Sequence, residues 1–289
     1  MLANKYKLIE KLSQGSFGKV FKAENIRTGE IVAIKTEVKS KEQKSLKMEA
    51  KIYHYLANAN GFPRLKWFGT TDNVNYLVTN LLECSITNLV KKSGPLSLKT
   101  VLLLGKQMIE RLETLHNHYL IHRDIKPDNF MINITDRTNK IFLIDFGFCK
   151  RYNHDGKHID FKINNSLIGT ANFVSINVHK GIEPSRRDDL ESSLYVMIYM
   201  LFGKDFGTNT NNLKQLILNK ELLTNVPQFL KVAINYVRTL KFEEEPDYKY
   251  IMQLFLDESG LYQDQEEDDE EEEDDEEEEE DDEEEEEDV

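Results

Sequence analysis

The sequence predicts an α+β fold in which a small β-rich lobe precedes a larger helical lobe and an acidic C-terminal tail. Three observations predict it. Over residues 6–38, apolar and polar residues alternate in short runs, a period of two that is typical of strands. After residue 97 the apolar residues recur at helical spacing, and residues 266–288 are 23 consecutive acidic residues. We place the three parts at residues 1–82, 83–262 and 263–289.

The β-rich lobe is predicted to hold five strands and one helix. Short runs bounded by turn residues predict the strands Tyr6–Leu12, Val20–Ala23, Glu30–Ile34, Leu65–Phe68 and Asn75–Leu81. Between the third and fourth strands, apolar residues such as Leu46 and Leu56 are separated by Lys and Glu, as on an amphipathic helix. This pattern predicts a helix over Lys41–Leu56.

The second lobe is predicted to be helical. Ser97 is placed to cap a helix whose apolar residues recur at helical spacing. These residues are Leu98, Val101, Leu102, Met108, Ile109, Leu112 and Leu115. The segment Tyr195–Phe202 is apolar at nearly every position and predicts a helix that is buried on all sides. Further helices are predicted over Leu213–Leu223, Val226–Leu240 and Tyr250–Leu256.

The acidic tail hides a basic folded part. The chain of 289 residues has a net charge of −15, but the tail after Tyr262 holds 24 of the 52 acidic residues and none of the 37 basic ones. The other 28 acidic residues leave residues 1–263 with a net charge of about +9. Because like charges repel, we expect residues 263–289 to be disordered.

Composition also indicates the cellular setting. Two cysteines, Cys84 and Cys149, provide no disulfide framework, which is typical of a reducing compartment. The sequence begins without the apolar core of a signal peptide, and no apolar run reaches the roughly 18 residues of a membrane helix. We expect an intracellular protein of the cytoplasm, the nucleus or both. We also expect a monomer without membrane association or direct nucleic-acid binding.

Residues 122–130 carry side chains suited to phosphoryl transfer. This reaction needs a carboxylate to orient the attacking hydroxyl, cations to neutralise the transferred group and oxygen ligands for Mg²⁺. Asp124 is the candidate carboxylate, and Lys126 is the candidate cation. Asn129 and Asp145 are candidate metal ligands. A strand–turn–strand segment between these two residues would bring both to one metal site at the mouth of a cleft.

The turn between the first two predicted strands is a candidate nucleotide contact. It comprises Leu12, Ser13, Gln14, Gly15, Ser16, Phe17, Gly18, Lys19 and Val20. Its glycines let backbone N–H groups approach phosphates, and Phe17 at the tip would cover them. In isolation an ordinary hairpin explains this turn equally well. However, Lys35 follows directly after the third predicted strand, where a phosphate contact is expected. Glu49, on the predicted helix, is its expected ion-pair partner.

These motifs resemble the eukaryotic protein kinase superfamily, and later residues narrow the resemblance to the casein kinase 1 family. The segment Gly169–Asn177 has Ser-Ile-Asn where most kinases have Ala-Pro-Glu, and it leads into Gly181–Ser192. Both segments look like hallmark sequences of that family. Further similarities lie at Met48–Tyr53, Ser97–Leu104 and Pro246–Tyr248, so the resemblance covers about residues 6–256.

The resemblance implies a bilobal protein-kinase fold with ATP between the lobes. It also implies Mg²⁺ as the cation and transfer of the γ-phosphate to Ser or Thr of protein substrates, with a preference for acidic or already phosphorylated ones. Lys126 favours a Ser or Thr acceptor over Tyr. The adenine site would include Ala33, Thr79 and Leu82, and the backbone of Leu82 would meet the base. Asp189 would hold the backbone of the catalytic loop from a buried helix.

Two residues depart from the family pattern. Ser13 replaces the first glycine of the nucleotide loop, and Asn172 replaces an arginine that grips the priming phosphate of substrates. A neutral amide in place of a planar cation removes the strongest type of phosphate contact. This change weakens the expectation that substrates must already be phosphorylated. Substrates selected by their acidic residues remain plausible, because the positive charge of residues 1–263 would attract them.

Two alternative functions stay open at the level of the sequence. The chain would be a pseudokinase or scaffold if its phosphotransfer residues were idle, or a binder of basic proteins through its acidic tail. For an active kinase, the tail suggests a further hypothesis. A tethered polyanion would compete with acidic substrates, because a flexible tether gives an effective concentration on the order of mM.

Overall fold

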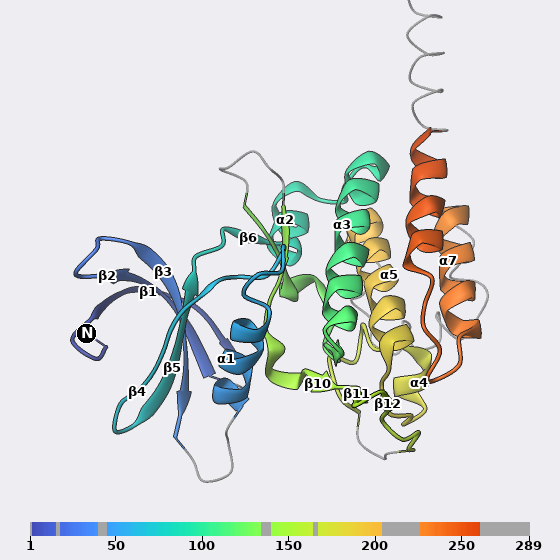
Figure 1. The fold of residues 1–289 in the computed structure, drawn as a ribbon. Helices are drawn as coiled ribbons and strands as arrows, with labels where there is room; N and C mark the ends of the chain where they lie inside the picture. The colour runs from blue at the N-terminus through green and yellow to red at the C-terminus, as the bar shows by residue number, and fades with distance from the viewer. Residues whose placement is uncertain are drawn as a thin grey trace, which may run out of the picture.

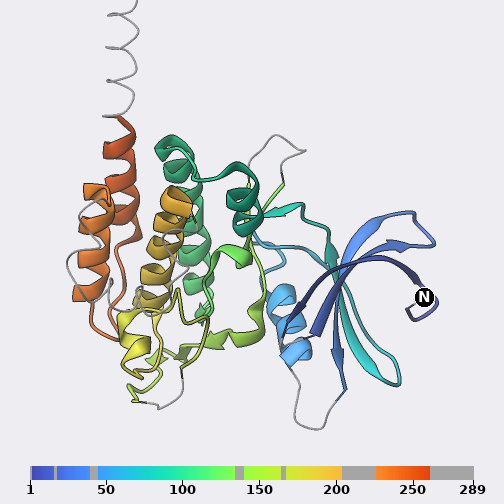
Figure 2. The same ribbon diagram turned by 180° about the vertical axis from the view of Figure 1, so that it is seen from behind.

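Two lobes make up the computed structural model, one built on an antiparallel sheet and the other on long helices, as predicted (Figure 1). The structure describes residues 2–15, 18–39, 45–133, 140–163, 167–203 and 226–260. Helix α1 lies between the sheet and the helical lobe in the views from both sides (Figure 1 and Figure 2). Within the ranges given above, no helix combines the length and apolar character needed to cross a bilayer.

The N-terminal sheet has five antiparallel strands in the order β1-β2-β3-β5-β4. They are β1 (Tyr6–Gly15), β2 (Gly18–Asn25), β3 (Ile31–Val38), β4 (Leu65–Thr70) and β5 (Val74–Asn80). Successive side chains point to opposite faces of the sheet. On β5, Leu77 joins the main hydrophobic core, whereas Val78 joins a second cluster on the other face with Tyr6 and Ile34.

Strands β1 and β2 run closer to their shared turn than predicted. The prediction ended the first strand at Leu12 and began the second at Val20, but β1 continues to Gly15, which pairs with Gly18. Because the added residues are mostly exposed, hydrophobic alternation does not reveal them, and backbone hydrogen bonds extend the pair. Gly18 has a φ of 129°, and a Cβ there would lie 1.8 Å from the carbonyl oxygen of Thr36, so only glycine fits.

Helix α1 spans Ser45–Tyr55 and packs against the sheet with one face. Its buried apolar residues are Leu46, Ala50, Ile52 and Tyr53. The predicted helix over Lys41–Leu56 is confirmed for this span, while residues 40–44 lie outside the described part of the chain. The amphipathic pattern therefore identified the face that holds α1 against the sheet.

In the helical lobe, α3, α5 and α7 lie side by side (Figure 1 and Figure 2). The helices are α2 (Ile86–Ser93), α3 (Leu98–Asn117), α4 (Ile176–His179), α5 (Arg186–Phe202) and α7 (Gln228–Thr239), and residues 248–260 are also helical. Ser97 caps α3 as predicted, since its side chain accepts a hydrogen bond from the Thr100 amide at 3.3 Å. The predicted helices over Val226–Leu240 and Tyr250–Leu256 are confirmed with shifted ends. The predicted helix Leu213–Leu223 and the tail 263–289 lie outside the described residues.

Helix α5 begins at Arg186 rather than at Tyr195. Ser185 and Asp188 form a capping box at its start, and polar residues of the first turns are buried. This polar stretch hid the start of the helix, because buried polar residues cannot be told from surface ones by pattern alone. The prediction of burial on all sides was wrong at the C-terminal end, where side chains keep partial exposure. These are Tyr199, Leu201 and Phe202.

Short strands in the helical lobe carry the loops of the site. β6 (Cys84–Ser85), β8 (Phe130–Ile132) and β9 (Ile141–Leu143) form one small sheet. The pairing of β8 with β9 is the predicted strand–turn–strand segment. The two-residue strands β7 (Leu120–Ile121), β10 (Lys150–Arg151), β11 (Asn153–His154) and β12 (Lys157–His158) are too short for any periodicity to predict.

Candidate active site

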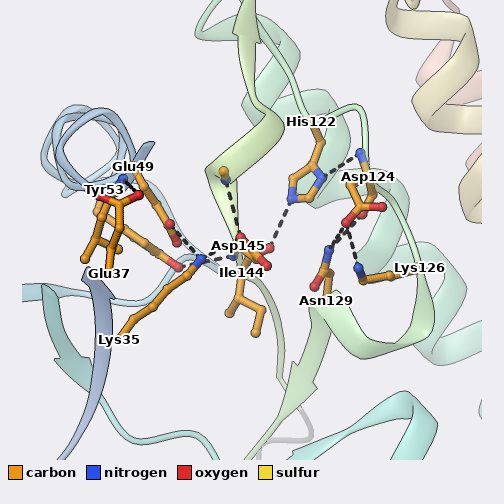
Figure 3. Close-up of polar contacts among 12 residues, drawn as sticks. Lys35, Glu37, Glu49, Tyr53, His122, Asp124, Lys126, Asn129, Ile144 and Asp145 are labelled. Carbon is orange, nitrogen blue, oxygen red and sulfur yellow. Dashed lines mark hydrogen bonds and ion pairs between the residues drawn. The ribbon is translucent and has the colours of Figure 1, made fainter. Parts of the chain in front are cut away.

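Lys35 lies in the middle of β3 and contacts two carboxylates (Figure 3). Its Nζ is 2.7 Å from Oε2 of Glu49 on α1 and 2.8 Å from Oδ1 of Asp145, which follows β9. Burial alone would lower the pKa of Lys35, but the charges of Glu49 and Asp145 raise it above its ordinary value. Lys35 therefore contacts its predicted partner, Glu49, and also the candidate metal ligand Asp145.

One ammonium shared by two carboxylates leaves one excess negative charge in the site. Burial raises the pKa of Glu49 to about 7, although Lys35 opposes this shift. At Asp145 burial also acts to raise the pKa, but contact with Lys35 prevails and holds it below its usual value. Of the two carboxylates, Asp145 is therefore the one whose charged form is favoured, and it is the side chain expected to meet a cation.

The start of α1 is tied to β3 by a residue that the sequence did not single out. Oε1 of Glu37 accepts a hydrogen bond from the backbone amide of Leu46 at 3.3 Å. Glu37 is two residues after Lys35 on the same strand and is buried. Its carboxylate partners one of the free amides at the helix start, so the strand that carries Lys35 also positions α1.

Asp124 is a buried carboxylate with three side-chain donors, of which Asn129 Nδ2 is the most distant at 3.4 Å from Oδ2. Its Oδ2 accepts a hydrogen bond from Lys126 Nζ at 2.7 Å, and its Oδ1 accepts one from the Thr170 hydroxyl at 2.7 Å. Lys126 Nζ is also 3.3 Å from Thr170 Oγ1, so the three side chains form a closed cluster. The sequence prediction named Asp124 and Lys126 but left Thr170 without a role in the site. The contact spans 46 residues, which local pattern cannot reveal.

The loop that carries Asp124 is held from below by α5. Asp189 accepts hydrogen bonds from the backbone amides of His122 and Arg123, at 2.7 Å and 2.9 Å. Arg123 has a φ of 68°, a left-handed conformation that a non-glycine residue adopts only when its surroundings hold it there. His122 Nε2 in turn donates to the carbonyl of Ile144 at 3.0 Å, which links this loop to the segment of Asp145.

Asn129 and Asp145 are brought to adjacent positions by the pairing of β8 with β9. Asn129 precedes β8, Asp145 follows β9, and the Ile144 amide donates to the carbonyl of Asn129 at 3.0 Å. Asn129 Nδ2 also donates to the carbonyl of Asp124 at 2.8 Å. In the described part of the chain, no group of three His, Cys, Asp or Glu side chains could cage a metal. One carboxylate and one amide suit Mg²⁺, which takes its other oxygens from phosphates and water.

Four of the predicted nucleotide contacts, Val20, Ala33, Lys35 and Thr79, lie on one face of the sheet. Val20 pairs with Lys35 across β2 and β3, and Ala33 pairs with Thr79 across β3 and β5. Lys35 and Ala33 are two residues apart, so these pairs share a face. Lys19 pairs with Thr36 instead and points to the opposite face.

Further predicted contacts in the described residues come from β1, β2 and the segment after β5. Leu12, Ser13, Gln14, Gly15 and Gly18 belong to β1 and β2 beside the turn. Leu82 follows β5 and is buried. Ser16 and Phe17 lie outside the described residues.

A comparison with known families agrees with this geometry. Residues 6–260 match the family model described as the protein kinase domain. The match covers most of the chain, and the chain therefore belongs to the protein kinase family. Membership implies ATP as the phosphoryl donor and a divalent cation, and the acidic and amide ligands described above fit such a cation.

Proposed function

We propose that this chain is a Ser/Thr protein kinase of the casein kinase 1 type. It would transfer the γ-phosphate of ATP, with Mg²⁺, to Ser or Thr of protein substrates that carry nearby acidic residues. The observation that carries the proposal is the cluster of Asp124, Lys126 and Thr170 beside the cluster of Lys35, Glu49 and Asp145. Together with Asn129 they contain the carboxylate, the cations and the metal ligands that phosphoryl transfer needs.

Each side chain has a task that follows from its contacts. Asp124 orients the substrate hydroxyl and accepts its proton, and Lys126, 2.7 Å from Asp124, neutralises charge on the transferred group. Lys35 holds the non-transferred phosphates, and Glu49 keeps its ammonium in place. Bound Mg²⁺ would supply charge neutralisation for the phosphates.

The hallmark segments of the resemblance fold as one unit, which supports the assignment to the casein kinase 1 type. Ser175 caps α4 by accepting a hydrogen bond from the Val178 amide at 3.1 Å. The same hydroxyl donates to Asp188 of the second segment at 2.5 Å. The two segments therefore contact each other directly through side chains that both motifs contain.

Selection of acidic substrates is supported by the net charge of residues 1–263. Asn172 is neutral and offers no charge to a phosphate. The nearby cations Lys150 and Arg123 already contact the carboxylate of Glu183. Its Oε1 is 2.6 Å from Lys150 Nζ and 3.7 Å from Arg123 Nη1. We propose plain acidic residues as the main determinant, drawn by the net charge of about +9 on residues 1–263.

Transfer of labelled phosphate from ATP to casein tests the function. We expect Mg²⁺-dependent labelling of Ser and Thr, and we expect Asp124→Asn to reduce kcat by at least about 100-fold. Hydrolysis of the labelled protein and separation of the phosphoamino acids would distinguish Ser and Thr from Tyr.

The outcomes separate the alternatives. Labelling on Tyr would contradict the proposed acceptor. Absence of transfer, with intact binding of basic proteins that depends on residues 263–289, would favour the acidic-tail binder. Absence of both would favour a scaffold.

A further inference from the structure

Helix α1 reaches the site through a second residue besides Glu49. Tyr53 lies one helical turn later, and its hydroxyl oxygen accepts a hydrogen bond from the backbone amide of Asp145 at 3.3 Å (Figure 3). Glu49 contacts Lys35, and Lys35 contacts the carboxylate of Asp145. Helix α1 therefore acts on Asp145 in two ways. Tyr53 contacts the backbone amide of Asp145 directly, and Glu49 contacts the Lys35 ammonium that also binds the Asp145 carboxylate.

The backbone of Asp145 needs such support. It has φ 66° and ψ 77°, a left-handed conformation that is unfavourable for a non-glycine residue. Within the residue's own turn, Oδ1 accepts a hydrogen bond from the Gly147 amide at 3.3 Å. That bond holds the side chain, whereas the bond to Tyr53 holds the peptide that precedes it.

The ring of Tyr53 holds the next residue along. It packs edge-on against Phe146, with centroids 4.9 Å apart and planes at 80°. Phe146 also contacts the rings of Phe62 and His122. Because the ring and the hydroxyl of Tyr53 act on different residues, replacement by phenylalanine removes only the contact to Asp145.

The position of Tyr53 is in turn set by the sheet. Glu37 anchors the start of α1 to β3, and Tyr53 is itself buried among the core residues of the helix face. A movement of α1 relative to β3 would therefore move the partner of the Asp145 amide.

We propose that the Tyr53 hydroxyl is a positioning group that holds the backbone of the metal ligand Asp145, so that its loss weakens nucleotide binding chiefly when the cation is present. The inference rests on the proposed role of Asp145 as a metal ligand. It assigns to Tyr53 a polar function in addition to its place in the core.

Calorimetric titration with a non-hydrolysable ATP analogue, in Mg²⁺ and separately in EDTA, tests the inference. We expect Tyr53→Phe to weaken binding in Mg²⁺ by about fivefold to tenfold and to leave binding in EDTA within about twofold. Tyr76→Phe is the matched control, because it removes the hydroxyl of a buried tyrosine on the other face of the sheet. It is expected to change neither value.

Hydrogen exchange at the Asp145 amide gives a second readout that needs no ligand. We expect Tyr53→Phe to accelerate this exchange by about fivefold or more and Tyr76→Phe to leave it unchanged. An equal loss of affinity in Mg²⁺ and EDTA, or unchanged affinity and exchange, would overturn the inference. If the unaltered chain itself binds the analogue no better in Mg²⁺, the failure lies in the proposed function instead.

Discussion

Buried acidic residues are the main feature of this molecule at the scale of single residues. Glu49, Asp124, Asp188 and Asp189 are each nearly inaccessible to solvent, and each has a cation, hydroxyl or backbone amide as a partner. Buried charge is unfavourable unless it is paired, so these positions are where substitution has large effects. At each position, the unfavourable burial of the charge is opposed by the contacts of that particular side chain.

Asp188 gives a prediction on pH. Burial raises its pKa to about 6, against the hydrogen bonds from Ser175 and Ser185. Between its ordinary value and about 6 the folded state binds more protons than the unfolded state, so this contribution to stability is lost as the pH rises through about 6. We expect Asp188→Asn to remove this loss, so that its stability relative to the unaltered chain improves by about 1–2 kcal/mol from pH 5 to pH 7.5.

Thermal and denaturant unfolding of both proteins across this pH range measures the effect. The hydrogen bonds lost in the variant lower its stability by a similar amount at every pH, so only the difference in slope is diagnostic. Parallel pH profiles for the two proteins would contradict the prediction.

At the scale of elements, the site is assembled where α1, the β8–β9 pair and α5 converge. Glu49 comes from α1, Asn129 and Asp145 flank the pair, and Asp189 on α5 holds the loop of Asp124. None of these elements contains the complete chemistry. Helix α5 is fixed in the core, and the carboxylate of Asp189 therefore holds the catalytic loop in a fixed position.

Asp189→Asn tests this support. An amide offers one acceptor oxygen in place of two, so the backbone amides of His122 and Arg123 cannot both keep their bonds. We expect kcat to fall by about 10-fold to 100-fold with a smaller change in KM for ATP, and we expect the melting temperature to drop by several degrees. A variant with unchanged kcat and a lower melting temperature would show that Asp189 serves stability alone.

Charge is unevenly distributed at the scale of the whole molecule. Residues 1–82 hold 14 basic and seven acidic residues, a net charge of about +7, while residues 83–263 hold 23 basic and 21 acidic residues. Most of the positive field thus originates in the β-rich lobe. The polyacidic segment, residues 266–288, carries the opposite charge in the same chain.

Removal of residues 263–289 tests whether the tail competes with substrates. We expect the shortened chain to have a several-fold lower KM for an acidic peptide at low salt, because the tethered competitor is gone. At high salt the two chains should converge, since the Debye length shrinks to about 3 Å at 1 M. Equal KM values at both salt concentrations would remove the hypothesis, and a peptide without acidic residues serves as the control.

The sequence alone determined the two lobes, most strands and helices, and the residues of the Lys35–Glu49 pair. Periodicity reports which face of an element is buried, and motif spacing reports which side chains one loop can present. Both are local properties, and they are readable without coordinates. The same locality explains the misses at the ends of β1 and α5, where exposed strand residues and buried polar residues carry no periodic signal.

The family resemblance implied that Asp189 supports the catalytic loop, but only the tertiary structure decided the other contacts that hold the site in place. Tyr53 is 92 residues from Asp145, and Thr170 is 46 residues from Asp124. Such bonds depend on how α1 and the segment of Thr170 pack against the rest of the molecule. The chemistry is therefore encoded locally, whereas its positioning arises from the packing of distant elements, because a hydrogen bond requires a particular distance and angle that no residue pattern specifies.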